Sequence, residues 1–146
     1  MIPTAKELMN RRSMAIDYGD ARTGLAVSDL TGTLAGEAWT VNEWNADRLA
    51  DTIVKEAKNR GVSTLVLGFP RNMDGTEGPR TEKSRALKEM LEARCDIPVI
   101  LWDERRTTVD AHRILTDAGK HGKKRKACVD AVAATLILQG YLDSRR

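Results

Sequence analysis

The stretch from Met14 to Asp29, MAIDYGDARTGLAVSD, constrains the fold more than any other part of the chain. Its two apolar runs predict short strands at Met14–Tyr18 and Gly24–Ser28. The residues between them are rich in Gly and Asp, which is typical of a tight turn. We therefore expect the chain to open with an antiparallel pair of strands.

Asp17 is an unusual residue for the first of these strands. Carboxylates are depleted in strands and costly to bury without a partner. Side chains alternate along a strand, so Asp17 shares its face with Ser13 and Ala15, which are small and leave room for a ligand. Two interpretations stay open: Asp17 ends the strand and caps the turn, or its charge is stabilised by a basic side chain, backbone N–H groups or a metal ion.

Length and composition indicate one globular domain. The chain has 146 residues, of which 41% are hydrophobic and 31% charged, as in soluble proteins. No apolar run approaches the roughly 18 residues of a membrane span, and the first residues lack the apolar core of a signal peptide. Cys95 and Cys128 are too few and too distant for a disulfide framework or a zinc site. We expect a cytoplasmic protein that does not contact membranes.

Positive charge is concentrated in one segment. The chain has 24 basic and 21 acidic residues, and residues 120–126, KHGKKRK, hold five of the basic ones and no acid. Such a segment is either a solvated loop or the footprint of a polyanion. Aromatic residues make up only 4% of the chain, which argues against binding of single strands mainly by base stacking.

The remaining pattern predicts strands alternating with helices. We expect residues 1–12 to be an N-terminal extension, helical at best, and residues 13–146 to form one domain. The further expected elements are an edge strand Leu34–Val41, a helix from the cap Asn45 to Arg60 ended by Gly61, a strand Thr64–Phe69, a loop Arg71–Pro79, a helix from Arg80 to about Arg94 with Ala86, Leu87, Met90 and Leu91 facing inward, a strand Ile97–Trp102, a helix Thr107–Ala118, a basic loop, and a helix from about Cys128 to Leu142. This order predicts a mixed sheet with helices on both faces.

Acidic residues gather where ligands usually bind in such sheets. Asp17 and the pair Asp103 and Glu104 end strands, and ligands collect beyond the carboxyl ends of parallel strands. Asp130 is expected in the first turn of the last helix, with its side chain partly toward the core. A favourable interaction with the helix dipole would also explain an acid there. Converging carboxylates repel each other, and oxygen ligands without His or Cys suit Mg²⁺ or Mn²⁺.

Such a site suits phosphodiester hydrolysis. Two metal ions can activate a water and stabilise the leaving oxygen, and the basic segment directly precedes Asp130. If the strand continues through Glu104, alternation places Glu104 on the face of Trp102 and Asp103 on the opposite face. Only one of the two acids can then reach the site.

Four motifs carry a family resemblance: AIDYGDARTGLAVSD, LVLGFPRNMDGTEGPRTEKS, LWDERRTT and KKRKACVDAVAATLIL. They resemble the YqgF family, also called RuvX or Holliday junction resolvase-like, over about Met14 to Leu142. The resemblance implies an RNase H-like fold, here a mixed five-stranded sheet flanked by helices. It also implies a nuclease acting on pre-16S ribosomal RNA or on branched DNA. The family's acidic residues carry over onto Asp17, Glu104 and Asp130 as catalytic and metal-binding residues.

The expected function is therefore a Mg²⁺- or Mn²⁺-dependent endonuclease, with RNA favoured over branched DNA. We infer nucleic-acid contact for a set of polar and basic residues: Arg22, Asn72, Lys123, Lys124, Arg125 and Lys126. Cleavage of a symmetric junction would favour a homodimer. The alternatives are a non-catalytic module that binds nucleic acid and an actin-like ATP-binding protein, which is weakened because such folds need two domains around the nucleotide.

Overall fold

The computed structural model describes residues 11–69, 77–103 and 122–145, and only the backbone of residues 122–128. The predicted helix Thr107–Ala118, Arg71–Thr76 of the predicted loop and residues 1–10 lie outside the described residues. The described elements, in chain order, are β1 (Arg12–Asp17), β2 (Arg22–Ser28), β3 (Ala35–Asn42), α2 (Ala46–Asn59), β4 (Val62–Phe69), α3 (Pro79–Arg94), β5 (Val99–Asp103) and α5 (Gly122–Ser144).

The strands form one mixed sheet in the order β3-β2-β1-β4-β5. β1 pairs antiparallel with β2, which pairs antiparallel with β3, and the predicted edge position of β3 is confirmed. On its other side β1 pairs parallel with β4, which pairs parallel with β5. The first strand of the chain is thus the middle strand of the sheet.

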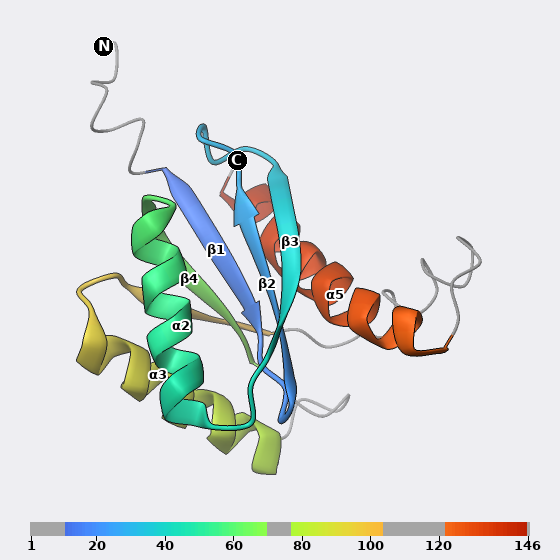
Figure 1. Ribbon diagram of the computed structural model, residues 1–146. Coiled ribbons are helices and arrows are strands. Elements are labelled where there is room, and N and C mark those ends of the chain that lie inside the picture. The colour runs from blue at the N-terminus through green and yellow to red at the C-terminus, as the bar shows by residue number, and fades with distance from the viewer. Residues whose placement is uncertain (1–10, 70–76, 104–121, 146) are drawn as a thin grey trace, which may run out of the picture.

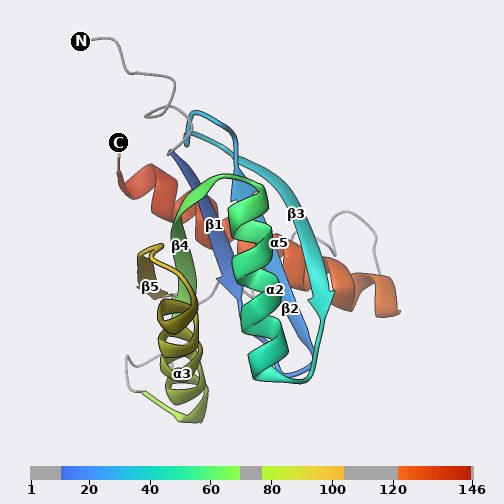
Figure 2. The same cartoon turned by 60° about the vertical axis from the view of Figure 1, so that its left-hand side comes forward.

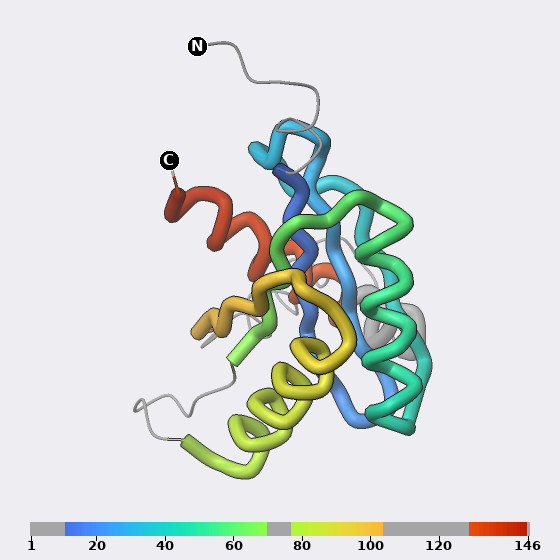
Figure 3. Tube along the Cα trace, turned by 90° about the vertical axis from the view of Figure 1, so that its left-hand side faces the viewer, coloured from blue at the N-terminus to red at the C-terminus, as the bar shows by residue number. Residues whose placement is uncertain are grey.

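Helices cover both faces of the sheet, as predicted. α2 and α3 lie on one face and α5 crosses the other, which Figures 1 and 2 show from two directions and Figure 3 shows with the sheet between the layers. Large side chains fill the α2/α3 side, where Met14 and Ile16 of β1 belong to the main buried cluster. On the α5 side, β1 and β2 contribute the small residues Ala15 and Ala26, which are fully buried. Among the described helices none is long and apolar enough to cross a membrane.

The ends of α2 follow the predicted chemistry. The Asn45 side chain accepts a hydrogen bond from the Arg48 N–H at 3.0 Å, which caps the first turn. Gly61 follows the helix with φ of +68°, a left-handed conformation that favours glycine. These local signals place α2 within one residue of the expected bounds.

Two helices differ from the expectation. The buried positions of α3 are Thr81, Ser84, Leu87 and Leu91, while Ala86 is exposed, so its predicted inward position is wrong. α5 begins at Gly122 rather than near Cys128. The backbone of residues 123–126 is therefore helical and not a loop, because Lys and Arg are good helix formers and nothing in the segment stops a helix.

Candidate active site

Three parallel strands end together at one edge of the sheet. β1 ends at Asp17, β4 at Phe69 and β5 at Asp103. We call this edge the carboxyl edge. The pairing register shows how level these ends are. Asp103 is paired with Phe69 of β4. Ile16, the residue before Asp17, is paired with Leu67 of β4. Ligand sites in open α/β sheets lie beyond such strand ends.

Asp17 lies on the face of the sheet that α5 covers. Ala15, two residues earlier, packs in the α5-side cluster, and alternation places Asp17 on the same face. The Cα partner of Asp17 in β2 is Gly24, and continuing the β1–β4 register places Gly68 beside Asp17 on the other side. Both strand neighbours of Asp17 therefore lack a side chain. The space that the sequence predicted around this carboxylate comes partly from these glycines.

Gly24 brings α5 against the sheet next to Asp17. A Cβ atom at Gly24 would lie 1.9 Å from the backbone oxygen of Asp130 and 2.5 Å from its carbonyl carbon. Only a glycine permits so close an approach. Because directly opposed residues of antiparallel strands have Cα atoms about 4.5–5.5 Å apart, the backbone of Asp130 lies one strand away from Asp17. Two acids 113 positions apart in the sequence thus lie on neighbouring segments at the carboxyl edge.

Asp130 is paired with a cation of β2. Arg22 Nε donates to Asp130 Oδ2 at 2.9 Å, and the side chains are 43% and 16% exposed, respectively. Burial raises the pKa of the Asp130 carboxyl above its usual value, and the hydrogen bond and charge of Arg22 oppose that shift. The predicted partly inward direction of Asp130 agrees with this low exposure. Arg22, expected to contact nucleic acid, also holds the acid in place.

The position of Asp130 within its helix differs from the expectation. Because α5 begins at Gly122, Asp130 lies in the helix interior rather than in the first turn. The helix dipole acts within the first or last turn, so it does not account for an acid here. Its half-buried carboxylate is instead held by Arg22, on a segment packed against the strand partner of Asp17.

The last strand presents its two faces as the alternation predicted. Ile100 and Trp102 pack with the α5-side cluster, whereas Val99 and Leu101 pack with the α2/α3-side cluster. Asp103, which is exposed, follows the second pair and so does not share the face of Asp17. Glu104 and Asn72 lie outside the described residues, as do the side chains of Lys123, Lys124, Arg125 and Lys126. Within the part of the chain that is described, no three acidic, His or Cys side chains group as a metal site would require.

A second charged cluster at this edge was not singled out from the sequence. Asp20, in the turn between β1 and β2, contacts Arg80 at 2.8 Å and Lys83 at 2.9 Å, both from the start of α3. The hydrogen bond from Lys83 and the charge of Arg80 lower the pKa of the Asp20 carboxyl. The cluster ties the turn after Asp17 to α3. Its partners are 60 or more positions apart, so no local pattern could have predicted them.

Comparison with known proteins supports both the fold and the family. Solved structures with the same fold include RuvC of Thermus thermophilus in complex with a Holliday junction substrate, with a TM-score of 0.57 at 13% identity, covering 92% of this chain and 94% of that one. The Fowlpox virus resolvase bound to Holliday junction DNA gives a TM-score of 0.59 at 10% identity, covering 92% and 98%. These likenesses confirm the predicted RNase H-like fold.

Relatives in sequence cover almost the whole chain. A protein of Acetivibrio thermocellus named "Putative pre-16S rRNA nuclease" is 44% identical over 92% of this chain and 96% of its own length. A protein of Bacillus subtilis with the same name is 42% identical over 91% and 98%. The sequence model of the family described as "RuvX: Holliday junction resolvase" matches residues 11–144. The chain therefore belongs to the RuvX family.

Proposed function

We propose that the protein is a cytoplasmic, divalent-metal-dependent endonuclease that hydrolyses phosphodiester bonds in precursors of 16S ribosomal RNA. The observation that carries the proposal is that the backbone of Asp130 packs against Gly24, the residue paired with Asp17 in β2, at the carboxyl edge. Membership of the RuvX family and the names of the relatives support the same reaction and substrate.

The donor set at this edge fits Mg²⁺ or Mn²⁺. Asp17 and Asp130 offer carboxylate oxygens, and we assign Glu104 as the third ligand because it directly follows Asp103 at the end of β5. Carboxylates without His or Cys suit hard divalent cations. When bound, two such ions supply an activated water and charge stabilisation for the leaving oxygen.

The protein's own groups prepare the site electrostatically. Arg22 balances the charge of Asp130 through its Nε. Its side chain is 43% exposed, so the remaining guanidinium donors can reach a phosphate oxygen. We assign Arg22 to this double role: it holds Asp130 and contacts the phosphate next to the cleaved bond.

Further nucleic-acid contacts come from the start of α5. Lys123, Lys124, Arg125 and Lys126 precede Asp130 on the same helix, and a rise of 1.5 Å per residue places their backbone about 6–11 Å along the axis from it. A phosphate chain passing through the site would run beside them. We also keep Asn72 as a substrate contact, because it follows the end of β4 at the carboxyl edge.

Resolution of Holliday junctions is the second candidate function. The description of the family and the junction-bound structures of the same fold favour it. A resolvase that cuts two strands symmetrically would act as a homodimer. A single cut in RNA would need only one copy. Measuring the molecular mass of the protein in solution, with and without a four-way junction, distinguishes a dimeric resolvase from a monomeric ribonuclease.

Cleavage assays with purified protein test the proposal. We expect Mg²⁺-dependent cutting of a labelled precursor RNA, abolished by EDTA, and weaker cutting of a four-way DNA junction. Asp17→Asn and Asp130→Asn should lose cleavage while still binding RNA. Asp51→Asn is the matched control, because Asp51 lies on α2 across the sheet and pairs with Arg94 at 2.7 Å. Cutting by Asp17→Asn at the normal rate would refute the site, and RNA binding without any cleavage would favour a non-catalytic module.

A further inference from the structure

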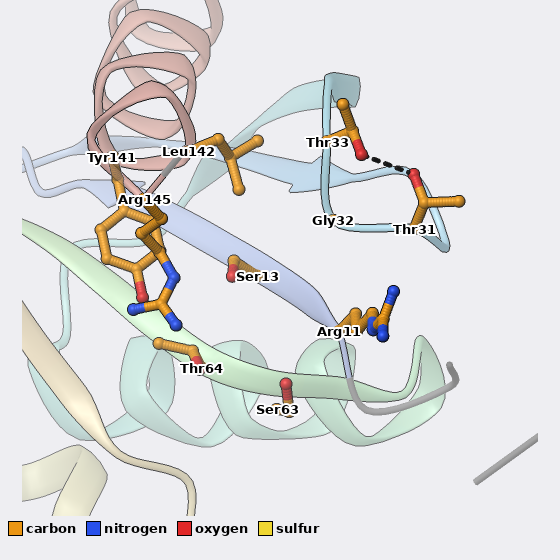
Figure 4. A pocket seen from close by; sticks show the side chains of 10 residues that line it. All are labelled: Arg11, Ser13, Thr31, Gly32, Thr33, Ser63, Thr64, Tyr141, Leu142 and Arg145. Atoms are coloured by element: carbon orange, nitrogen blue, oxygen red, sulfur yellow. Dashed lines mark hydrogen bonds between the residues drawn. The ribbon is translucent and has the colours of Figure 1, made fainter. Parts of the chain in front are cut away.

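A polar pocket lies at the end of the sheet opposite the carboxyl edge. It has a volume of about 530 Å³ and lies between the start of β1, the turn from β2 to β3, the start of β4 and the end of α5. We call it the basal pocket, and Figure 4 shows the side chains that line it. Ser13 lines it and Asp17 does not, although both belong to β1, and four residues of strand separate them by about 13 Å. The pocket is therefore distinct from the candidate active site.

Two arginines give the basal pocket a positive charge. Arg11 and Arg145 project into it from opposite sides, and none of the described residues that line it is acidic. Within the described residues neither guanidinium has a carboxylate partner, although Arg145 lies over the Tyr141 ring at 5.4 Å. Every other arginine with a described side chain donates to a carboxylate or a carbonyl oxygen. The pair in the pocket is thus suited to an anion that comes from outside the chain.

Buried hydroxyl groups face the same space. The side chains of Ser13 and Tyr141 are each 5% exposed and line the pocket. In the described part of the chain neither hydroxyl has a hydrogen-bond partner, which is unusual because buried polar groups are nearly always bonded. Thr64 adds a third hydroxyl from β4. Hydroxyl donors beside two guanidinium groups are a combination that recognises the oxygens of a phosphate.

We propose that the basal pocket binds a phosphate group. The phosphate comes either from a free ligand, such as inorganic phosphate or a mononucleotide, or from the backbone of a nucleic-acid strand. This inference does not depend on cleavage at the carboxyl edge, since the basal pocket uses different residues. A phosphate bound here would contact β1, β4 and α5 at once and so fix the end of α5 on the sheet.

Binding measurements on the full chain test the proposal. The probes are inorganic phosphate, adenosine 5′-monophosphate and a short RNA oligonucleotide, each titrated calorimetrically without divalent metal. The double variant Arg11→Gln/Arg145→Gln should bind the recognised probe at least about tenfold more weakly. Tyr141→Phe, which removes only the hydroxyl, should weaken binding severalfold. Arg48→Gln is the control, because Arg48 lies on α2 and pairs with Glu43 at 3.3 Å.

The three probes distinguish the sources of the phosphate. A free ligand is assigned if phosphate or the mononucleotide loses affinity in the double variant while the oligonucleotide does not. A strand backbone is assigned if the oligonucleotide loses affinity in the double variant and its binding becomes less sensitive to salt. The slope of the logarithm of the association constant against the logarithm of salt concentration should then be shallower by about one unit. Thermal unfolding confirms that each variant is folded. Equal affinities of the wild type and the double variant for all three probes, or no binding at millimolar concentrations, would overturn the proposal.

Discussion

Replacing Gly24 by alanine is the sharpest test of how the candidate active site is assembled. The new Cβ would lie 1.9 Å from the Asp130 carbonyl oxygen, and real Cβ contacts essentially never fall below 3.0 Å. α5 and β2 must therefore separate by about 1.1 Å at this point. The atoms that the new Cβ would meet belong to the backbone of α5, and the Cβ is itself fixed to the backbone of β2. No side-chain rotation can therefore relieve the clash.

The expected losses follow from this displacement. Overpacking of a rigid contact typically costs about 1–3 kcal/mol, which for a chain of this size lowers the melting temperature by roughly 2–12 °C. A misplacement of about 1 Å can reduce catalysis about 100-fold. We expect Gly24→Ala to cut RNA at least that much more slowly in saturating Mg²⁺, under conditions where the protein is fully folded by circular dichroism.

A second glycine at the interface between α5 and the sheet provides the control. A Cβ at Gly140 would meet the Trp102 side chain at 3.4 Å, which is ordinary van der Waals contact. Gly140→Ala should be neutral or stabilising by up to about 1 kcal/mol, because alanine favours a helix interior, and it should keep normal cleavage. If Gly24→Ala were as stable and as active as the wild type, Asp130 would not be held against β2 as we describe.

The remaining predictions concern charge. Asp130→Asn should raise the melting temperature in metal-free buffer at neutral pH, because burial raises the pKa of this carboxyl and ionising it opposes folding; the gain should vanish in acid, where the wild-type carboxyl is protonated too. Asp29→Asn should cost about 1 kcal/mol of unfolding free energy at neutral pH, since the N–H of Thr33 and further donors lower the pKa of Asp29. That stability is present above the ordinary aspartate pKa and lost as the pH falls through the lowered value, so urea titrations of the two proteins should converge in acid. Neutralising Lys123–Lys126 should weaken RNA binding and flatten its salt dependence, whereas an unchanged slope would exclude phosphate contact. Glu104→Gln should abolish cleavage without changing the melting temperature, and Asp103→Asn should keep turnover; the opposite pattern would exchange the two assignments.

Local signals in the sequence predicted most of the described fold. The Asn45 cap, Gly61 and the short apolar strands depend on nearby residues; the cap and Gly61 lie where expected, and the strand ends differ from the expected ones by no more than about two residues. The unusual position of Asp17 was also visible, because an acid in an apolar run is unusual whatever the tertiary structure, although the strand was expected to continue to Tyr18 and ends at Asp17. The start of α5 was predicted wrongly, since the residues before Cys128 are polar and carry no apolar periodicity to mark a helix.

Long-range contacts could not be predicted from the sequence in the same way. Arg22 and Asp130 are 108 positions apart, and no sequence pattern near either residue indicates that the two are paired. The buried face of α3 includes Thr81 and Ser84. Hydrophobic periodicity does not identify them as buried, because both side chains carry a polar hydroxyl group. Such features depend on how the layers meet, and a pattern within one element does not contain that information.

The place of α5 after all the described strands in chain order has a consequence for synthesis. The middle strand, β1, is synthesised before the helix that covers its Ala15 face and carries Asp130, and every other described strand also precedes that helix. A nascent chain or a truncated product that lacks α5 therefore exposes an apolar sheet face and lacks Asp130, although it already contains Asp17 and Glu104. Such a chain would be prone to aggregation but unable to cut RNA, so cleavage begins only after translation of the whole domain is complete.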